Sequence, residues 1–101
     1  MVPLLENYGR YNAMHCTYIL KSLKSGIFYY GYTDNLRRRL EEHNNGRSLF
    51  TKGHIPWKLV WYGVFENKQK AKDFELYLKS GSGKAFAYKR LVALAKDGRG
   101  R

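Results

Sequence analysis

Residues 15–32 read HCTYILKSLKSGIFYYGY, and this stretch decides the fold. Its two ends, residues 15–21 and 27–32, are rich in β-branched and aromatic residues, which are enriched in β-strands. The segment between them, KSLKSG, is short, polar and ends in glycine, as is typical of a turn. The stretch is therefore predicted to form an antiparallel β-hairpin.

The hairpin is expected to bring Tyr18 and Tyr29 together. If the turn centres on Leu23 and Lys24, the two tyrosines lie directly opposite each other. Cross-strand partners share a face of the sheet, so both rings are then predicted to point the same way. A bulge at Gly26 would change this register.

A helix is predicted over residues 35–44, directly after the hairpin. Thr33-Asp34 is an N-cap signal for it. Leu36 and Leu40 lie one turn apart and mark the face that packs on the core.

The same helical geometry sorts three consecutive arginines. At about 100° per residue, Arg39 and His43 share an edge of the buried face. Arg38 lies almost opposite the core, where it meets solvent or distant phosphates, and Arg37 lies at the other edge. Arg39 is therefore the arginine expected beside His43.

The second half of the chain continues the alternation of strand and helix. Residues 44–56 form a loop with two glycines, a proline and three cations including Arg47 and Lys52, and loops of this length are often functional. Residues 57–65 (WKLVWYGVF) are strand-like, 68–79 follow Asn67 as an N-capped helix, and 84–96 form a last helix after a Ser-Gly break. The predicted fold is α+β, with a small, mostly antiparallel three-stranded sheet flanked by helices.

Glu75 lies close to the apolar stripe that Ala71, Phe74 and Leu78 mark on the second predicted helix. An acid in that position invites a functional explanation. The structural alternative is an ion pair with Lys79 one turn later, which needs no function.

Size, composition and charge limit the function classes. The 101 residues suit one compact domain, and we expect a loose leader over 1–14, the domain over 15–92 and a basic tail over 93–101. The single cysteine rules out an intramolecular disulfide and is expected in a reducing cytoplasm. The sequence contains no run of eighteen apolar residues, so no membrane span is predicted. The formal net charge of +11 favours a polyanionic partner, with a generally basic proteome as the plainer explanation.

These residues together resemble the GIY-YIG nuclease domain, and most closely the short, stand-alone bacterial proteins related to the N-terminal nuclease domain of the repair excinuclease. The resemblance covers His15 to about Leu91. It rests on Tyr18, on Tyr29-Tyr30-Gly31, and on Arg39 eight residues after that glycine. His43 and the later Glu75 complete the family pattern, whereas Cys16-Thr17 and Tyr30 depart from it.

The resemblance implies hydrolysis of a DNA strand with one divalent metal, Mg²⁺ or Mn²⁺, held by Glu75. Arg39 would hold the scissile phosphate, and Tyr18, Tyr29 or His43 would activate water, three alternatives that the sequence leaves open. The cations expected to contact nucleic acid are Arg37, Arg38, Arg47, Lys52, Lys79 and Lys84.

Branched or nicked DNA is the expected substrate, used in repair or recombination, with a protein partner that supplies specificity and with no membrane partner. A binding module of the same fold that does not cut is the main alternative. A small RNA-associated protein has less support, because the chain has no GXXG clamp or aromatic RNP-type run.

Overall fold

The computed structural model describes residues 14–92, which form an α+β fold as expected. Its sheet has three antiparallel strands in the order β2-β1-β3, namely β1 (His15–Ser22), β2 (Phe28–Thr33) and β3 (Trp57–Phe65). The hairpin is confirmed. The third strand joins it on the β1 side, so β1 is the central strand.

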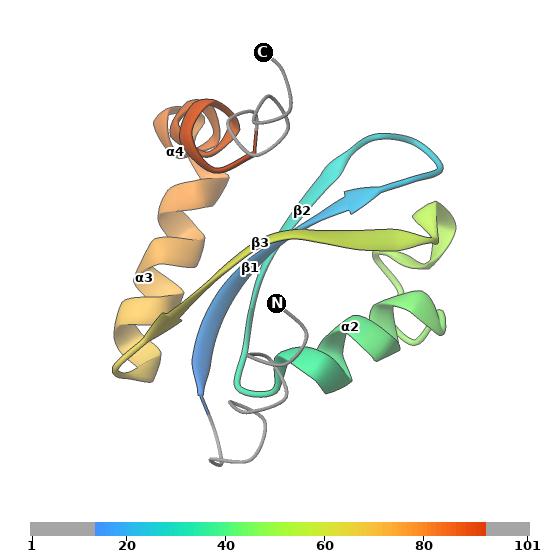
Figure 1. The fold of residues 1–101 in the computed structure, drawn as a ribbon, viewed down its shortest axis with the longest axis horizontal. Helices are drawn as coiled ribbons and strands as arrows, with labels where there is room; N and C mark the ends of the chain where they lie inside the picture. Colours follow the sequence, from blue (N-terminus) through green and yellow to red (C-terminus); the bar gives the residue numbers. More distant parts are fainter. Residues whose placement is uncertain (1–13, 93–101) are drawn as a thin grey trace.

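Helices cover both faces of the sheet (Figure 1). Helix α2 (Leu36–Asn44) lies on one face. Helix α3 (Lys68–Lys79) and the short α4 (Gly81–Phe86), which continues as a π-helical turn over Ala87–Val92, lie on the other. Among the described residues no helix has the length and apolar character needed to cross a membrane.

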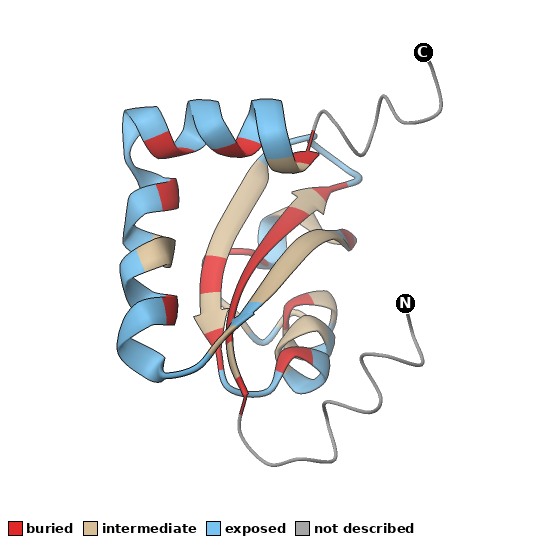
Figure 2. Cartoon of the chain, turned by 60° about the vertical axis from the view of Figure 1, so that its left-hand side comes forward, coloured by how far each residue is buried: buried red, intermediate tan, exposed pale blue. Residues whose placement is uncertain are grey.

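Each face of the sheet has its own core. Tyr18, Leu20, Leu36 and Trp57 belong to the core under α2, on what is called here the site face. On the opposite side, Ile19, Leu78, Ala87 and Val92 pack under α3 and α4, on the support face. Figure 2 shows that the buried positions of α3 form a stripe toward the sheet, while its outer side is exposed.

The hairpin register differs from the one expected. Tyr18 pairs with Gly31, and Tyr29 pairs with Leu20, two residues away from Tyr18 along the strand. The backbone N–H of Ser22 donates to the carbonyl of Ile27, so the turn that this bond closes spans the four residues 23–26, and Gly26 takes a positive φ of 80°. Because the shift is an even number of residues, both tyrosines still point to the site face.

Two helix starts also differ from the sequence prediction. Asn35, rather than Thr33-Asp34, caps α2, because its side chain accepts a hydrogen bond from the backbone N–H of Arg38 while Thr33 ends β2. The last helix begins at Gly81 instead of residue 84, because Ser80 caps it through the N–H of Gly83. The N-cap at Asn67 is as predicted.

The predicted leader and tail lie outside the described residues, except for Met14. Met14 is buried in the core of the site face, and its backbone N–H donates to the carbonyl of Asp34. The packed part of the chain therefore includes the residue just before β1.

Candidate functional site

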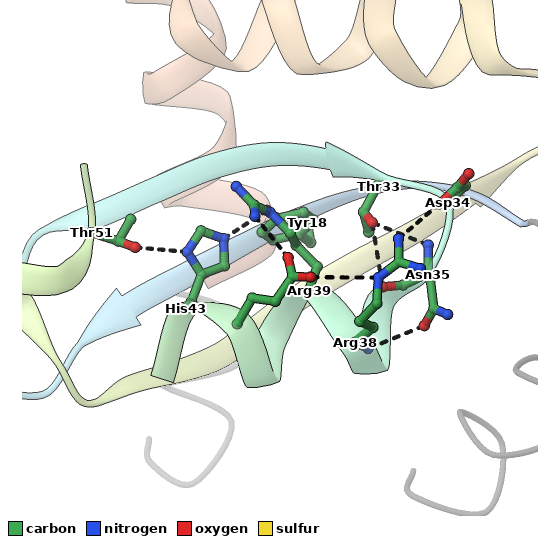
Figure 3. A network of polar contacts seen from close by, with 9 residues as sticks. Tyr18, Thr33, Asp34, Asn35, Arg38, Arg39, His43 and Thr51 are labelled. Carbon is green, nitrogen blue, oxygen red and sulfur yellow. Dashed lines mark hydrogen bonds and ion pairs between the residues drawn. The ribbon is translucent and has the colours of Figure 1, made fainter. Parts of the chain in front are cut away.

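A chain of buried hydrogen bonds crosses the site face from β1 to the loop after α2 (Figure 3). The Tyr18 hydroxyl lies 2.9 Å from Nε2 of His43, and Nδ1 of His43 lies 2.8 Å from the hydroxyl of Thr51. All three side chains are fully or almost fully buried. The network therefore fixes both the position of the Tyr18 hydroxyl and the orientation of the imidazole ring.

Gly31 makes room for the Tyr18 ring. A Cβ atom added at Gly31 would lie 2.5 Å from the Tyr18 hydroxyl oxygen and 2.6 Å from Cζ. Such distances are far below van der Waals contact, so only glycine allows the ring to lie across β2. This close approach explains physically why a glycine follows two residues after Tyr29.

Hydrogen bonds hold the loop that carries Thr51 at both of its ends. The side-chain amide of Asn44 donates to the carbonyl of Trp57 and accepts from its N–H, and the Trp57 indole Nε1 donates to the carbonyl of Thr51 at 2.9 Å. The backbone of Thr51 is thus held by Trp57 at the start of β3, which is itself held by Asn44 at the end of α2.

Arg39 lies beside this network at the surface of α2. Its Nη1 donates to Glu42 at 2.9 Å, and its side chain is about one-third exposed. Burial works against the charged form, but the interactions with Glu42 and with the hydroxyls of Tyr18 and Tyr29 outweigh it and raise the pKa of Arg39. Arg39 is therefore a permanent cation, oriented by Glu42 and within interaction range of the two tyrosine hydroxyls.

The proton positions along the network follow from the partners. The Tyr18 hydroxyl shares a hydrogen bond with Nε2 of His43, and an uncharged imidazole has one nitrogen that donates and one that accepts. When Nε2 accepts from the Tyr18 hydroxyl, Nδ1 donates to the hydroxyl of Thr51. Burial and the nearby Arg39 lower the pKa of His43 to about 4, in agreement with an uncharged ring.

Tyr18 is held in its neutral form. Burial is the main cause that raises its pKa, and Tyr29 adds to the effect, whereas Arg39 opposes it. The negative charge of Glu75 raises the pKa of Tyr18 further. Although Glu75 belongs to α3 on the support face, its carboxylate therefore acts within electrostatic range of the Tyr18 hydroxyl.

Tyr29 is the more accessible of the two tyrosines. Its ring centroid lies 4.9 Å from that of His43, 6.2 Å from that of Trp57 and 6.0 Å from that of Phe50. Unlike Tyr18, it is only partly buried. Its ring thus borders the network on one side and the surface on the other.

The Glu75 side chain is 15% exposed, and its carboxylate lies 2.8 Å from the ammonium group of Lys79. This is the ion pair that the sequence offered as the structural alternative, and it is present. Across residues 14–92, no group of three or more histidine, cysteine, aspartate or glutamate side chains is arranged to hold a metal ion. Any metal at this site would depend on Glu75 together with water and substrate oxygens.

The cations expected to contact nucleic acid fall into two groups. Arg37, Arg38, Arg47 and Lys52 belong to α2 and its following loop, and are exposed. Arg38 lies 3.6 Å from both Asp34 and Glu42. Lys79 and Lys84 are carried by α3 and α4, the helices of the support face.

Sequence reasoning overlooked two members of the site. Thr51 lies in the loop that the sequence indicated as functional, but no local pattern shows that its hydroxyl reaches His43. Glu42 could have been found, since it stands three residues after Arg39 on the same helix and such pairs are neighbours.

Known proteins share the sequence pattern that underlies this geometry. The pattern of the GIY-YIG catalytic domain matches residues 14–89, which include both tyrosines, Arg39, His43 and Glu75. The chain belongs to the GIY-YIG family. The matching description is that of a catalytic domain, which suggests a nuclease-type activity for this GIY-YIG chain.

Similar proteins carry the name UPF0213. One from Clostridium perfringens (strain 13 / Type A) is 45% identical over 67 residues, covering 65% of this chain and 71% of the relative. One from Bacillus licheniformis is 38% identical over 71 residues, covering 69% and 72%. The solution NMR structure of a UPF0213 protein from Bacillus halodurans is 33% identical, covers 75% of this GIY-YIG chain and 83% of that one, and has a TM-score of 0.48.

Proposed function

We propose that this protein is a metal-dependent endonuclease that hydrolyses phosphodiester bonds in DNA. The observation that supports the proposal most is that a cation, tyrosine hydroxyls and a carboxylate interact with one another. The guanidinium of Arg39 interacts with the hydroxyls of Tyr18 and Tyr29, and the negative charge of Glu75 raises the pKa of Tyr18. Cleaving a phosphodiester needs a cation for the phosphate, a group that handles a proton, and a carboxylate that can hold a metal.

In this proposal Arg39 binds the scissile phosphate. Its Nη1 is already oriented by Glu42, and its side chain remains partly exposed. A planar guanidinium can donate two parallel hydrogen bonds to phosphate oxygens, and it keeps its charge at any working pH. Holding the phosphate still before reaction is the part of catalysis that a fixed cation supplies.

Tyr29 is the residue that we assign to the attacking water. His43 is fully buried and both of its ring nitrogens already have partners, so it has no free nitrogen to offer to water. Tyr18 is buried as well and its hydroxyl is engaged with His43. Tyr29 alone of the three is partly exposed, and its hydroxyl is among the groups that raise the pKa of Arg39.

His43 and Tyr18 are then positioning residues. Thr51 orients His43, His43 holds the Tyr18 hydroxyl, and the interaction of that hydroxyl with Arg39 helps to keep the guanidinium charged. This order fixes the Tyr18 hydroxyl beside the His43 ring. Supporting hydrogen bonds of this kind hold catalytic groups within the small tolerance that reaction requires.

Glu75 is the side chain that would hold Mg²⁺ or Mn²⁺. A single carboxylate suits Mg²⁺, which in phosphoryl-transfer sites keeps several waters and takes further oxygens from the substrate. Lys79 would have to give up its ion pair with this carboxylate. The bound metal would stabilise negative charge on the phosphate and on the leaving oxygen.

The proposed substrate is DNA with a nick, flap or branch, in repair or recombination in the cytoplasm. The excess of 19 lysines and arginines over 8 acids supports binding led by phosphates. If about five phosphates are neutralised, the logarithm of the binding constant should fall with the logarithm of salt concentration with a slope of roughly −4 to −5. A protein partner would then supply specificity.

A binding module that does not cut DNA is the second candidate. Two observations favour it: Glu75 is paired with Lys79 at 2.8 Å, and Arg39 with Glu42 at 2.9 Å. Both charged groups are thus satisfied within the chain. In this alternative the exposed cations of α2 and its loop grip phosphates and no metal binds.

The deciding experiment is a cleavage assay on nicked, flapped and fully paired DNA, with Mg²⁺ or Mn²⁺ and with EDTA. We expect metal-dependent cutting that falls at least about 100-fold in Glu75→Ala and in Arg39→Ala. Glu66→Ala is the matched control for Glu75, because Glu66 forms a similar ion pair with Lys70 four residues later.

Arg90→Ala, which removes an exposed cation from the π-helical turn, is the control for Arg39. Both control variants should cut as the wild type does. DNA binding without cutting under any metal condition would favour the binding module. Cutting that survives in both Glu75→Ala and Arg39→Ala would contradict the proposed site.

A further inference from the structure

Two neighbouring apolar side chains stand out from the surface beside the candidate site. Leu49 is 82% exposed and Phe50 is 78% exposed, the largest exposed fractions among the large hydrophobic side chains in residues 14–92. A single exposed apolar residue is ordinary, but a pair this exposed has no role in the core. Folding does not account for their presence at this position.

The turn that carries them is held in place by the site itself. The carbonyl of Ser48 accepts hydrogen bonds from the backbone N–H groups of Thr51 and Lys52, which closes the turn. Thr51, the next residue after Phe50, is buried, with its hydroxyl on His43 and its carbonyl on Trp57. The two apolar side chains therefore project from a fixed base.

Phe50 adjoins the residue that we assign to the attacking water. Its ring centroid lies 6.0 Å from that of Tyr29, with the planes inclined by 46°. The same loop carries the exposed cations Arg47 and Lys52 on either side of the pair. An apolar, aromatic tip flanked by cations matches a ligand with an aromatic ring and a negatively charged backbone.

We propose that Leu49 and Phe50 bind an unpaired nucleobase next to the scissile phosphate, with Phe50 stacking on the base. This inference rests on the proposed function and names its substrate class, DNA with single-stranded nucleotides at the cleavage point. In a paired duplex each base is covered by its neighbours, so stacking on Phe50 first requires unstacking. That cost is absent at a flap or in a single strand.

The charge of the loop selects this occupant over a protein. Arg47 and Lys52 add two positive charges to a surface whose chain carries a net charge of +11. Cationic grooves with aromatic side chains are the general way in which proteins bind single strands, because every base has a face on which to stack. A protein partner that uses Leu49 and Phe50 is the outcome that the experiment can reveal instead.

The test measures binding of fluorescently labelled oligonucleotides in EDTA, so that no strand is cut. A duplex with a single-stranded flap is compared with a fully paired duplex of the same sequence. Phe50→Ala should weaken binding to the flap between about 5-fold and about 150-fold, the range that base stacking supplies. Binding to the paired duplex should change less than about twofold, because phosphate contacts remain.

Three further variants sharpen the result. Phe50→Trp keeps an aromatic face and should retain flap binding, whereas Leu49→Ala should weaken it less than Phe50→Ala does. Tyr88→Ala, which deletes an exposed aromatic ring from the π-helical turn on the support face, should leave both affinities unchanged. Melting curves should match the wild type, because Phe50 is outside the core.

Equal affinity of wild type and Phe50→Ala for the flap would overturn the stacking inference, leave the endonuclease proposal standing, and make a protein the better occupant. An equal loss on flap and paired duplex would overturn it too. If the wild-type protein binds neither DNA at low salt, the proposed function fails and this inference fails with it.

Discussion

The two faces of the sheet are built on different principles. On the support face, Ile19, Leu78 and Ala87 are fully buried apolar side chains packed against one another. On the site face, the buried groups include a histidine and a tyrosine whose polar atoms bond to each other. Among the described residues, no buried side-chain nitrogen or oxygen lacks a hydrogen-bond partner.

This difference separates stability from chemistry. Burying apolar surface stabilises the fold directly. A buried polar network contributes little more than an apolar core would, and it becomes costly when one member is lost. The polar network of the site face is therefore better explained by a role in positioning Tyr18 and Arg39 than by stability. Of the five candidate catalytic residues, Glu75 is the one that a helix of the support face carries.

The largest effect on stability is expected on the support face. Leu78→Ala should lower the free energy of unfolding by about 2–5 kcal/mol, because Leu78 is fully buried between α3 and the sheet. Denaturant unfolding at low temperature measures the loss. Cleavage activity, divided by the folded fraction at the assay temperature, should stay near that of the wild type. A loss of activity beyond the loss of folded protein would show that the two faces are not separable.

Gly31→Ala tests the contact on which the site face depends. The added methyl would meet the Tyr18 hydroxyl at 2.5 Å, and this ring cannot move away without breaking its bond to His43. We expect a loss of about 1–3 kcal/mol in unfolding free energy, together with a loss of activity. Both are measured on the same preparation, by denaturant unfolding and by the cleavage assay.

The control for this variant is Gly81→Ala, because a Cβ at Gly81 meets nothing within 4 Å. Gly81→Ala should leave both the free energy of unfolding and the cleavage activity unchanged. Tyr18→Phe removes the nearest atom, so in the double variant the penalty of the Gly31 change should shrink. A Gly31→Ala protein as stable and active as the wild type would contradict the close packing.

The sequence predicted the sheet and helices well because their signals are local. The hairpin from 15 to 33, the Asn67 cap and the apolar stripe of α3 each follow from residue types a few positions apart. The prediction was wrong about the N-cap of α2 and about the hairpin register, where neighbouring residues compete for the same role. Asn35 replaced Thr33-Asp34 as the cap, and a four-residue turn shifted the register by two positions.

The candidate site shows the same limit more sharply. Helical periodicity singled out Arg39 among three arginines as the neighbour of His43, and the charge of Arg39 helps to lower the pKa of His43. Periodicity could not reveal that His43 is fully buried, because that follows from a loop residue, Thr51, folding back over the helix end. Contacts between distant segments depend on the whole packing, which local patterns in a single sequence do not contain.

The pH dependence of stability gives a third way to separate the faces. The pKa of His43 falls from an unfolded value near 6.5 to about 4. Between these values the unfolded state binds a proton that the folded state does not, so stability decreases as the pH falls. From pH 7 to pH 5 the wild type should lose about 1–2 kcal/mol of unfolding free energy on this account.

His43→Gln cannot titrate, and its stability should depend less on pH over the same range. Carboxylates are largely ionised above pH 5, so they add little to the difference. Urea unfolding at several pH values measures both curves. Parallel curves for the two proteins would mean that His43 is not held in its neutral form by the network.

The smallest effects come from a matched pair of threonines, one on each face. The Thr51 hydroxyl bonds to His43 at 2.8 Å, and the Thr17 hydroxyl donates to the carbonyl of Ala71 at 2.6 Å. Both threonines are fully buried. Changing either to valine keeps the shape and removes one hydrogen bond, so each variant should lose about 1 kcal/mol of unfolding free energy.

Activity should distinguish the two variants although stability does not. Without the Thr51 hydroxyl the imidazole loses its orienting partner, so Thr51→Val should lower kcat and alter its pH profile. Thr17→Val should leave both unchanged per folded molecule, because Thr17 ties β1 to α3 through the carbonyl of Ala71, away from the network. Single-turnover cleavage across a pH series measures the contrast. Equal kcat values and pH profiles in the two variants would mean that the Tyr18–His43–Thr51 chain serves packing alone, and that the two faces differ in composition but not in role.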